Sequence, residues 1–230
     1  MGYIYVPVKE VKEKRVYCSD KMNRLKQALN NEGWDVDFSL VGSGSRNLVT
    51  RIEGQGFDLD YNLEIKRPAI GEFVASELKN YVMQFLNEIK DDTFQENFKD
   101  CQDSTSAITA RLIVDKKRKF SFDVAILAKN KNGDFCRLIH DKTLQRYYWT
   151  IIPNSKDLYV GFDALKEDSY SQDIRDVYLE KKNLYLSRND ESNHPSFVVF
   201  AETVNEVYSQ HYGQMISAIA PFFNVIIPDR

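Results

Sequence analysis

Residues 57–65 alternate apolar and polar side chains without a break, and no other feature of the sequence constrains the fold as strongly. A period of two indicates a β-strand that buries one face and exposes the other. Pro68 and Gly71 follow the run and end it. The sequence therefore predicts a half-buried strand, with Asp58 and Asp60 together on its polar face.

The patterns on either side of this strand predict both strands and helices. Ser19 or Asp20 is a candidate N-cap for a helix that ends at Gly33. Further strands are expected over 34–41, 107–114, 120–127 and 135–139, and further helices over 72–90, 169–188 and 197–219. We therefore expect an α+β fold with a mixed sheet and flanking helices in residues 1–152, and a small, mainly helical region in residues 153–230.

Composition narrows the class of protein. The 230 residues are 43% hydrophobic and 13% aromatic, with a net charge of -3, which is ordinary for a globular protein. No apolar run approaches the ~18 residues of a membrane span, and the first residues lack the pattern of a signal peptide. Three dispersed cysteines argue against a disulfide framework or a zinc ribbon. We expect a cytoplasmic protein without a membrane partner.

Asp58 and Asp60 are the first candidate site residues. Residues two apart in a strand lie ~6–7 Å apart on the same face. Two carboxylates that close repel each other unless a cation lies between them, and oxygen ligands suit Mg²⁺ or Mn²⁺. The alternative for an isolated pair is a solvated acidic face.

A small-residue segment, residues 42–45 with the sequence Gly-Ser-Gly-Ser, ends the strand expected over 34–41. Glycine permits close approach of the backbone, neighbouring N–H groups can cradle phosphate, and serine hydroxyls can donate to phosphate oxygens. The alternative is a flexible turn. The segment is not a Walker A loop, because no Gly-Lys-Ser/Thr follows.

Asp123 is the third candidate, in the middle of the otherwise apolar residues 120–126. A carboxylate in such a strand needs a charged partner or a metal ion. A salt-bridged structural aspartate is the alternative.

Taken together, the three features resemble the nucleotidyltransferase superfamily of DNA polymerase β type. That family has Gly-Ser after an apolar residue, then Asp-apolar-Asp-apolar, and later one more carboxylate on a separate strand. In this chain twelve residues separate the small-residue segment from the acidic strand, and the matching residues are Ser43-Gly44-Ser45, Asp58-Leu59-Asp60-Tyr61 and Asp123. The resemblance covers roughly residues 19–128.

The resemblance implies a mixed sheet with helices mainly on one side and an active site at its exposed edge. It also implies a metal-dependent enzyme that transfers a nucleoside monophosphate from a nucleoside triphosphate to a hydroxyl acceptor and releases pyrophosphate. The implied roles are catalysis and Mg²⁺ or Mn²⁺ binding for Asp58, Asp60 and Asp123, binding of the β- and γ-phosphates for Gly44 and Ser45, and further phosphate contacts for Ser43 and Arg46. A surface arginine on a loop is an equally fair interpretation of Arg46.

The acidic strand is also similar to that of the bacterial relatives of oligoadenylate and cyclic GMP-AMP synthases, in which it often reads Phe-Asp-apolar-Asp. Those synthases usually carry a longer helical lobe than residues 153–230 provide. The acceptor therefore stays open among RNA, a protein, a small molecule and a second nucleotide. The alternative functions are a synthase of cyclic or linear oligonucleotide second messengers of antiviral-defence type, and a catalytically inactive module that binds a nucleotide or a partner.

Overall fold

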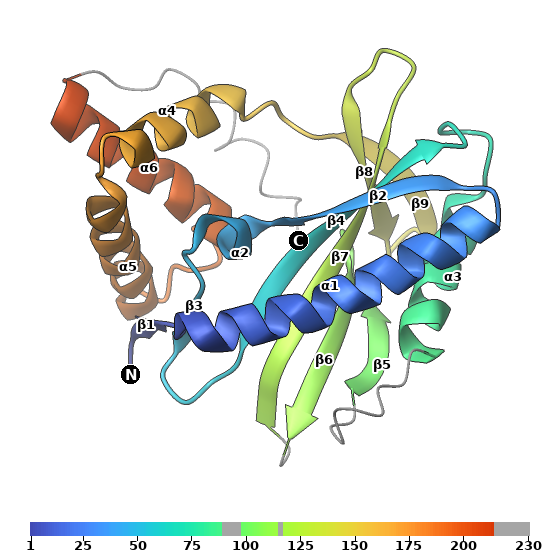
Figure 1. Ribbon diagram of the computed structural model, residues 1–230, viewed down its shortest axis with the longest axis horizontal. Coiled ribbons are helices and arrows are strands. Elements are labelled where there is room, and N and C mark those ends of the chain that lie inside the picture. Colours follow the sequence, from blue (N-terminus) through green and yellow to red (C-terminus); the bar gives the residue numbers. More distant parts are fainter. Residues whose placement is uncertain (89–97, 115–116, 214–230) are drawn as a thin grey trace. The chain divides into compact units, whose positions relative to one another are not determined.

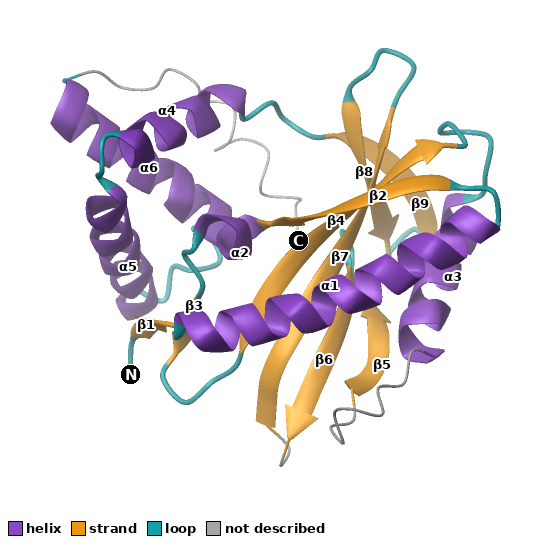
Figure 2. Cartoon of the chain, viewed as in Figure 1, coloured by secondary structure: helices purple, strands orange, loops and turns teal. Residues whose placement is uncertain are grey.

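The computed structural model describes residues 1–88, 98–114 and 117–213 of the chain (Figure 1). It divides into two compact units, one of Val6–Ile152 and one of Met1–Tyr5 with Pro153–Arg230. The first holds the large sheet and the second is mainly helical (Figure 2). The assignment of residues 1–152 as a catalytic core and 153–230 as a C-terminal region concerns function as well as shape, and it stays a prediction.

The elements of the first unit begin as intermixed helices and strands and, among the described residues, end with a run of strands. In chain order they are α1 (Val8–Asn31), β2 (Asp35–Val41), α2 (Gly42–Arg46), β3 (Thr50–Ile52), β4 (Phe57–Arg67), α3 (Ala75–Glu88), β5 (Phe98–Asp103), β6 (Ile108–Val114), β7 (Lys117–Lys129), β8 (Phe135–Asp141) and β9 (Arg146–Ile151). The second unit contains β1 (Tyr3–Tyr5), α4 (Lys156–Glu167), α5 (Ser171–Ser187) and α6 (Ser196–Tyr212).

The seven-stranded sheet of the first unit is mixed. Its strand order is β2-β4-β7-β6-β5, with β8 beside β7 and β9 beside β8. The central strands β4 and β7 are parallel, and the other pairs are antiparallel. In the parallel pair Asp60 lies opposite Asp123, so two segments far apart in the sequence become immediate neighbours.

Helices α1 and α3 pack on one face of this sheet. Helix α1 contributes Cys18, Met22, Leu25 and Leu29 to the core of this unit, each at most 1% exposed. Helix α4 and its neighbours belong to the other unit. Along β4 every second residue is buried, from Phe57 to Ile65, which matches the alternation in the sequence. The remaining side chains of β4, Asp58 and Asp60 among them, lie on the opposite face.

The helix expected from Ser19 or Asp20 starts earlier than predicted. Helix α1 begins at Val8, directly after Pro7, so both proposed N-caps lie in its interior and that assignment is wrong. Its buried residues Val11 and Cys18 continue the apolar stripe toward the N-terminus at a spacing of seven. Lysine- and glutamate-rich sequence, which favours helix, fills the exposed positions.

Other elements match the sequence analysis more closely. Strands β2, β4, β6, β7 and β8 and helix α5 fall at the predicted places, whereas α3 begins at Ala75 rather than residue 72. Strands β3, β5 and β9 and helix α4 were not anticipated. The ends predicted for two helices, residues 89–90 and 214–219, lie outside the described residues.

The second unit holds the chain's first residues as well as its last helices. The backbone N–H of Tyr3 donates to Oδ1 of Asn183 at 2.6 Å, and Nδ2 of Asn183 donates to the carbonyl of Tyr3 at 3.2 Å. In its helices Phe200 packs against Phe162 with the rings edge to face. Across the described residues of the chain, no helix combines the length and the apolar character needed to cross a membrane.

Leu25→Ala tests the packing of α1 on the sheet. Leu25 is fully buried in the core cluster, so we expect the free energy of unfolding to fall by about 2–5 kcal/mol. Denaturant titration measures this loss. The control Gln27→Ala changes an exposed position of the same helix and should stay within about 0.5 kcal/mol of the unaltered chain. Equal effects of the two substitutions would contradict the packing.

Candidate active site

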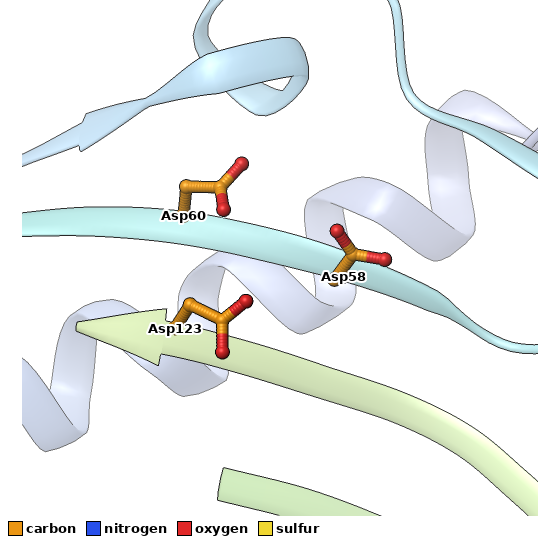
Figure 3. A group of neighbouring side chains, drawn as sticks. All are labelled: Asp58, Asp60 and Asp123. Carbon is orange, nitrogen blue, oxygen red and sulfur yellow. The ribbon is translucent and has the colours of Figure 1, made fainter. Parts of the chain in front are cut away.

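The three aspartates singled out in the sequence lie together on the face of the sheet that α1 and α3 leave uncovered. Asp58 and Asp60 come from β4, and Asp123 comes from β7 (Figure 3). Each contributes one carboxylate oxygen to a group in which all the oxygens lie within 4.8 Å of one another. Parallel pairing of β4 and β7 produces this convergence, because it sets Asp60 directly opposite Asp123.

The pKa of Asp60 shows the electrostatic effect of this cluster. Its pKa is raised to about 7, by burial first and then by the neighbouring carboxylates of Asp58 and Asp123. The guanidinium groups of Arg46 and Arg137 act in the opposite direction and lower it. The repulsion among the carboxylates outweighs the two cations, so the cluster favours additional positive charge.

The donor set fits a hard divalent cation. Carboxylate oxygens are the ligands that Mg²⁺ and Mn²⁺ prefer. Three of them that lie within 4.8 Å of one another can hold such an ion. A cation between the carboxylates would also remove the repulsion that raises the pKa of Asp60. The residues Asp58, Asp60 and Asp123 therefore have the chemistry of a Mg²⁺ or Mn²⁺ site.

Gly42 begins α2 directly beside Asp60. Its φ angle of +63° lies in the left-handed region, and a Cβ atom built on it would overlap Oδ2 of Asp60 and lie 3.1 Å from Cγ. Only glycine satisfies both conditions. The sequence analysis placed Gly42 in the small-residue segment without giving it a role, although a glycine directly after a strand is the available signal.

The small-residue segment forms one turn of helix, α2, rather than a flexible turn. Gly44 is buried, and a Cβ there would lie 2.9 Å from Cδ2 of Leu59 and 3.1 Å from Cδ1 of Leu40. Glycine at this position thus lets α2 pack closely on β2 and β4.

The two serines of α2 differ in surroundings. Ser45 is exposed, and its hydroxyl donates to the carbonyl of Gly42 at 3.0 Å. Ser43 is half-buried, and its carbonyl accepts the backbone N–H of Leu48 at 3.0 Å. The phosphate-binding roles expected for Ser43, Gly44 and Ser45 stay predictions.

Arg46 ends α2 and is only 8% exposed. Its charge lowers the pKa of Asp60, so the guanidinium lies within electrostatic reach of the acidic cluster. The interpretation of Arg46 as a surface arginine on a loop is wrong, because the side chain is buried. Its expected contact with a phosphate stays a prediction.

Arg137 is a candidate site residue that the sequence analysis missed. It lies on β8 opposite Leu127 of β7, on the same face of the sheet as Asp123, because Leu127 and Asp123 are four residues apart on one strand. Burial lowers the pKa of Arg137, while the charge of Asp60 raises it. The available signal is an arginine between the buried residues Cys136 and Leu138 of a predicted strand.

Comparison with solved structures shows which fold the chain has. No family model matches the chain, and no curated protein matches it in sequence. Among solved structures, the form of DncV from Vibrio cholerae bound to 3'-deoxy GTP matches with a TM-score of 0.52 and 16% sequence identity, covering 84% of this chain and 50% of that chain. The chain has a nucleotidyltransferase fold. The α+β class with a mixed sheet and flanking helices, expected from the sequence, is confirmed.

Two further structures with this fold are similar over shorter stretches. The CD-NTase CdnG of Bradyrhizobium diazoefficiens in complex with GTP has a TM-score of 0.49 and 18% identity, covering 70% of this chain and 44% of that chain. The DncV cyclic AMP-GMP synthase in complex with nonhydrolyzable GTP has a TM-score of 0.48 and 16% identity, covering 65% and 39%. The matched part of each of these neighbours is half of its length or less.

Proposed function

We propose that this protein is a metal-dependent nucleotidyltransferase, which transfers a nucleoside monophosphate from a nucleoside triphosphate to a hydroxyl acceptor and releases pyrophosphate. The observation that carries the proposal is the convergence of Asp58, Asp60 and Asp123 from two strands to within 4.8 Å. The nucleotidyltransferase fold around them supports it.

In this proposal the three aspartates hold Mg²⁺ or Mn²⁺ through their carboxylate oxygens. When bound, such ions lower the pKa of an attacking hydroxyl and stabilise charge on the departing pyrophosphate. The protein's own contribution is positional, because β4 and β7 fix the carboxylates in a rigid sheet before substrate arrives. Gly42 keeps the backbone of α2 against Asp60 without a side chain between them.

The positive charges beside the cluster suit the polyphosphate of a nucleoside triphosphate. Arg46 and Arg137 both lower the pKa of Asp60, so both positive charges act on the cluster, and we propose that they also attract the phosphates. Ser43 and Ser45, with the backbone around Gly44, are the further phosphate contacts that we propose from the small-residue segment.

The acceptor to test first is a second nucleotide. DncV, the neighbour with the TM-score of 0.52, is described as a cyclic AMP-GMP synthase in another of its structures. An oligonucleotide or cyclic product is therefore the second candidate function, beside transfer to RNA, to a protein or to a small molecule.

Incubation with each of the four ribonucleoside triphosphates, alone and mixed, tests the proposal. We expect release of pyrophosphate that depends on Mg²⁺ or Mn²⁺, and mass spectrometry of the products identifies the acceptor. A linear or cyclic oligonucleotide would support the second candidate function. Tight binding of a triphosphate without any turnover would contradict the enzyme and indicate a binding module.

The raised pKa of Asp60 predicts how stability depends on pH in metal-free protein. A folded-state pKa of about 7, above the unfolded value of 3.8, means that folded protein retains a proton that unfolded protein releases between these values. Stability is therefore lost as the pH rises from about 4 to about 7. We expect Asp60→Asn to raise the melting temperature at pH 8, and to have little effect at pH 4.

Divalent cation should reverse this loss in the unaltered chain. At pH 8 we expect Mg²⁺ or Mn²⁺ to raise the melting temperature by several degrees, since about 1 kcal/mol corresponds to roughly 2–4 °C in a chain of this size. The increase should be absent in Asp60→Asn. Thermal unfolding in EDTA and in excess metal measures both effects, and an equal response of the two proteins to metal would count against the site.

A further inference from the structure

A cavity of about 500 Å³ lies in the first unit, away from the acidic cluster. It is open to solvent on one side, and it is lined by the C-terminal end of α1, the residues before β2, residues 72–74 and the N-terminal half of α3. These helices cover the face of the sheet opposite the three aspartates. Its volume is within the range of about 300–1,000 Å³ that is typical of small-molecule sites.

Aromatic side chains form one part of its wall. Trp34 and Phe73 line it with ring centroids 5.0 Å apart at 68°, and Phe73 also meets Trp149 edge to face at 6.1 Å. Tyr81 lines the side formed by α3. Because Phe73 is held between two tryptophans, the apolar wall is fixed before any ligand arrives.

Acidic side chains form much of the rest of the lining, together with Leu29, Val74 and Leu78. Glu32, Glu72 and Glu77 are all exposed, and no lysine, arginine or histidine lines the cavity. Within the described residues Glu32 and Glu77 form no ion pair, and Glu72 accepts only the backbone N–H of Ala69 at 2.8 Å. The negative charge reaches the aromatic wall, since burial and the charge of Glu32 both raise the pKa of Tyr81.

This arrangement differs from that of two partly exposed acids of the same unit, Asp37 and Glu10. Asp37 pairs with Lys26 and Lys66 at 3.1 and 3.3 Å, and Glu10 pairs with Arg51 at 2.8 Å. The glutamates of the cavity also do not form a metal site, because among the described residues only the three aspartates gather closely enough to share an ion. What the cavity offers is a fixed aromatic wall beside uncompensated carboxylates.

We propose that this cavity binds a small organic cation, with an ammonium or guanidinium group at the glutamates and an apolar carbon chain against Trp34, Phe73 and Tyr81. Cations are attracted to aromatic faces as well as to carboxylates, and the carbon chain gains from apolar contact. The negative lining repels nucleotides, so the cavity is not a second nucleotide site. The proposal is independent of the proposed transferase activity.

A matched pair of probes tests the charge requirement. 1,5-Diaminopentane carries two ammonium groups, whereas 1,5-pentanediol has the same chain length without charge. We expect the diamine to bind about tenfold more tightly or better at physiological salt, measured by calorimetry and by fluorescence of the chain's two tryptophans, Trp34 and Trp149. Equal affinity of the two probes, or no binding of the diamine at millimolar concentration, would overturn the proposal.

Variants locate the binding. The double substitution Glu32→Gln with Glu77→Gln alters exposed positions, so it should leave the fold intact while weakening diamine binding about tenfold. Glu53→Gln, at an exposed glutamate outside the cavity, is the matched control and should bind as the unaltered chain does. Trp34→Leu should weaken binding and also reduce the fluorescence response. If the double substitution binds the diamine as tightly as the control, the cavity is not the site.

Discussion

Asp58→Asn, Asp60→Asn and Asp123→Asn are each expected to lower turnover of nucleoside triphosphate by roughly 10³-fold or more. The substitution keeps the size of the side chain but removes the charge that holds the cation. Because the three oxygens form one cluster within 4.8 Å, loss of any one should be about as damaging as loss of all three. Pyrophosphate release in Mg²⁺ and in Mn²⁺ measures the effect.

Glu64→Gln is the matched control for this set. Glu64 lies on the same face of β4, four residues beyond Asp60, and is not a member of the cluster. We expect its turnover to stay within a few-fold of the unaltered chain. Full activity in any of the three aspartate variants would show that the carboxylate at that position is not needed for catalysis.

Gly42→Ala carries the second large effect, a loss of turnover of about 10²-fold. The added methyl group would overlap the carboxylate of Asp60, so either that side chain or the start of α2 must move. A displacement of about 1 Å is enough for a loss of this size. The left-handed φ of +63° adds about 1–2 kcal/mol of backbone strain.

Gly33→Ala separates strain from displacement. Gly33 has φ +87°, and a Cβ there meets nothing within 4 Å, so this substitution introduces backbone strain far from Asp60. Both variants should unfold at lower denaturant concentration, and only Gly42→Ala should lose activity. If the Gly33→Ala and Gly42→Ala variants lose activity equally, the contact between Gly42 and Asp60 does not matter for activity.

The sequence alone predicts the acidic strand and the shared face of its two aspartates. Strict alternation over residues 57–65 is a local signal, and it identified β4 and the shared face of Asp58 and Asp60. The order of the small-residue segment, the acidic strand and Asp123 then indicated the nucleotidyltransferase fold, which the structural comparison confirms. Each of these steps uses residues that are close together or an order along the chain.

The resemblance grouped Asp123 with Asp58 and Asp60, but the strand pairing that brings them together was not predicted from the sequence. That β7 lies beside β4 in parallel, so that Asp123 faces Asp60, depends on pairing between segments separated by about sixty residues. Arg137 joins the site only because β8 folds back on β7. The early start of α1 was missed for a different reason, since Ser19 resembles an N-cap although the apolar stripe extends back to Val11.

The pairing of β4 with β7 also bears on how the protein matures during synthesis. A chain still emerging from the ribosome has Asp58 and Asp60 well before Asp123 is made, and the carboxylate of Asp123 reaches them only when β7 inserts between β4 and β6. The metal-binding cluster should therefore form in one step, once β7 has been made, and a shortened product that ends before β7 should show none of the proposed transferase activity.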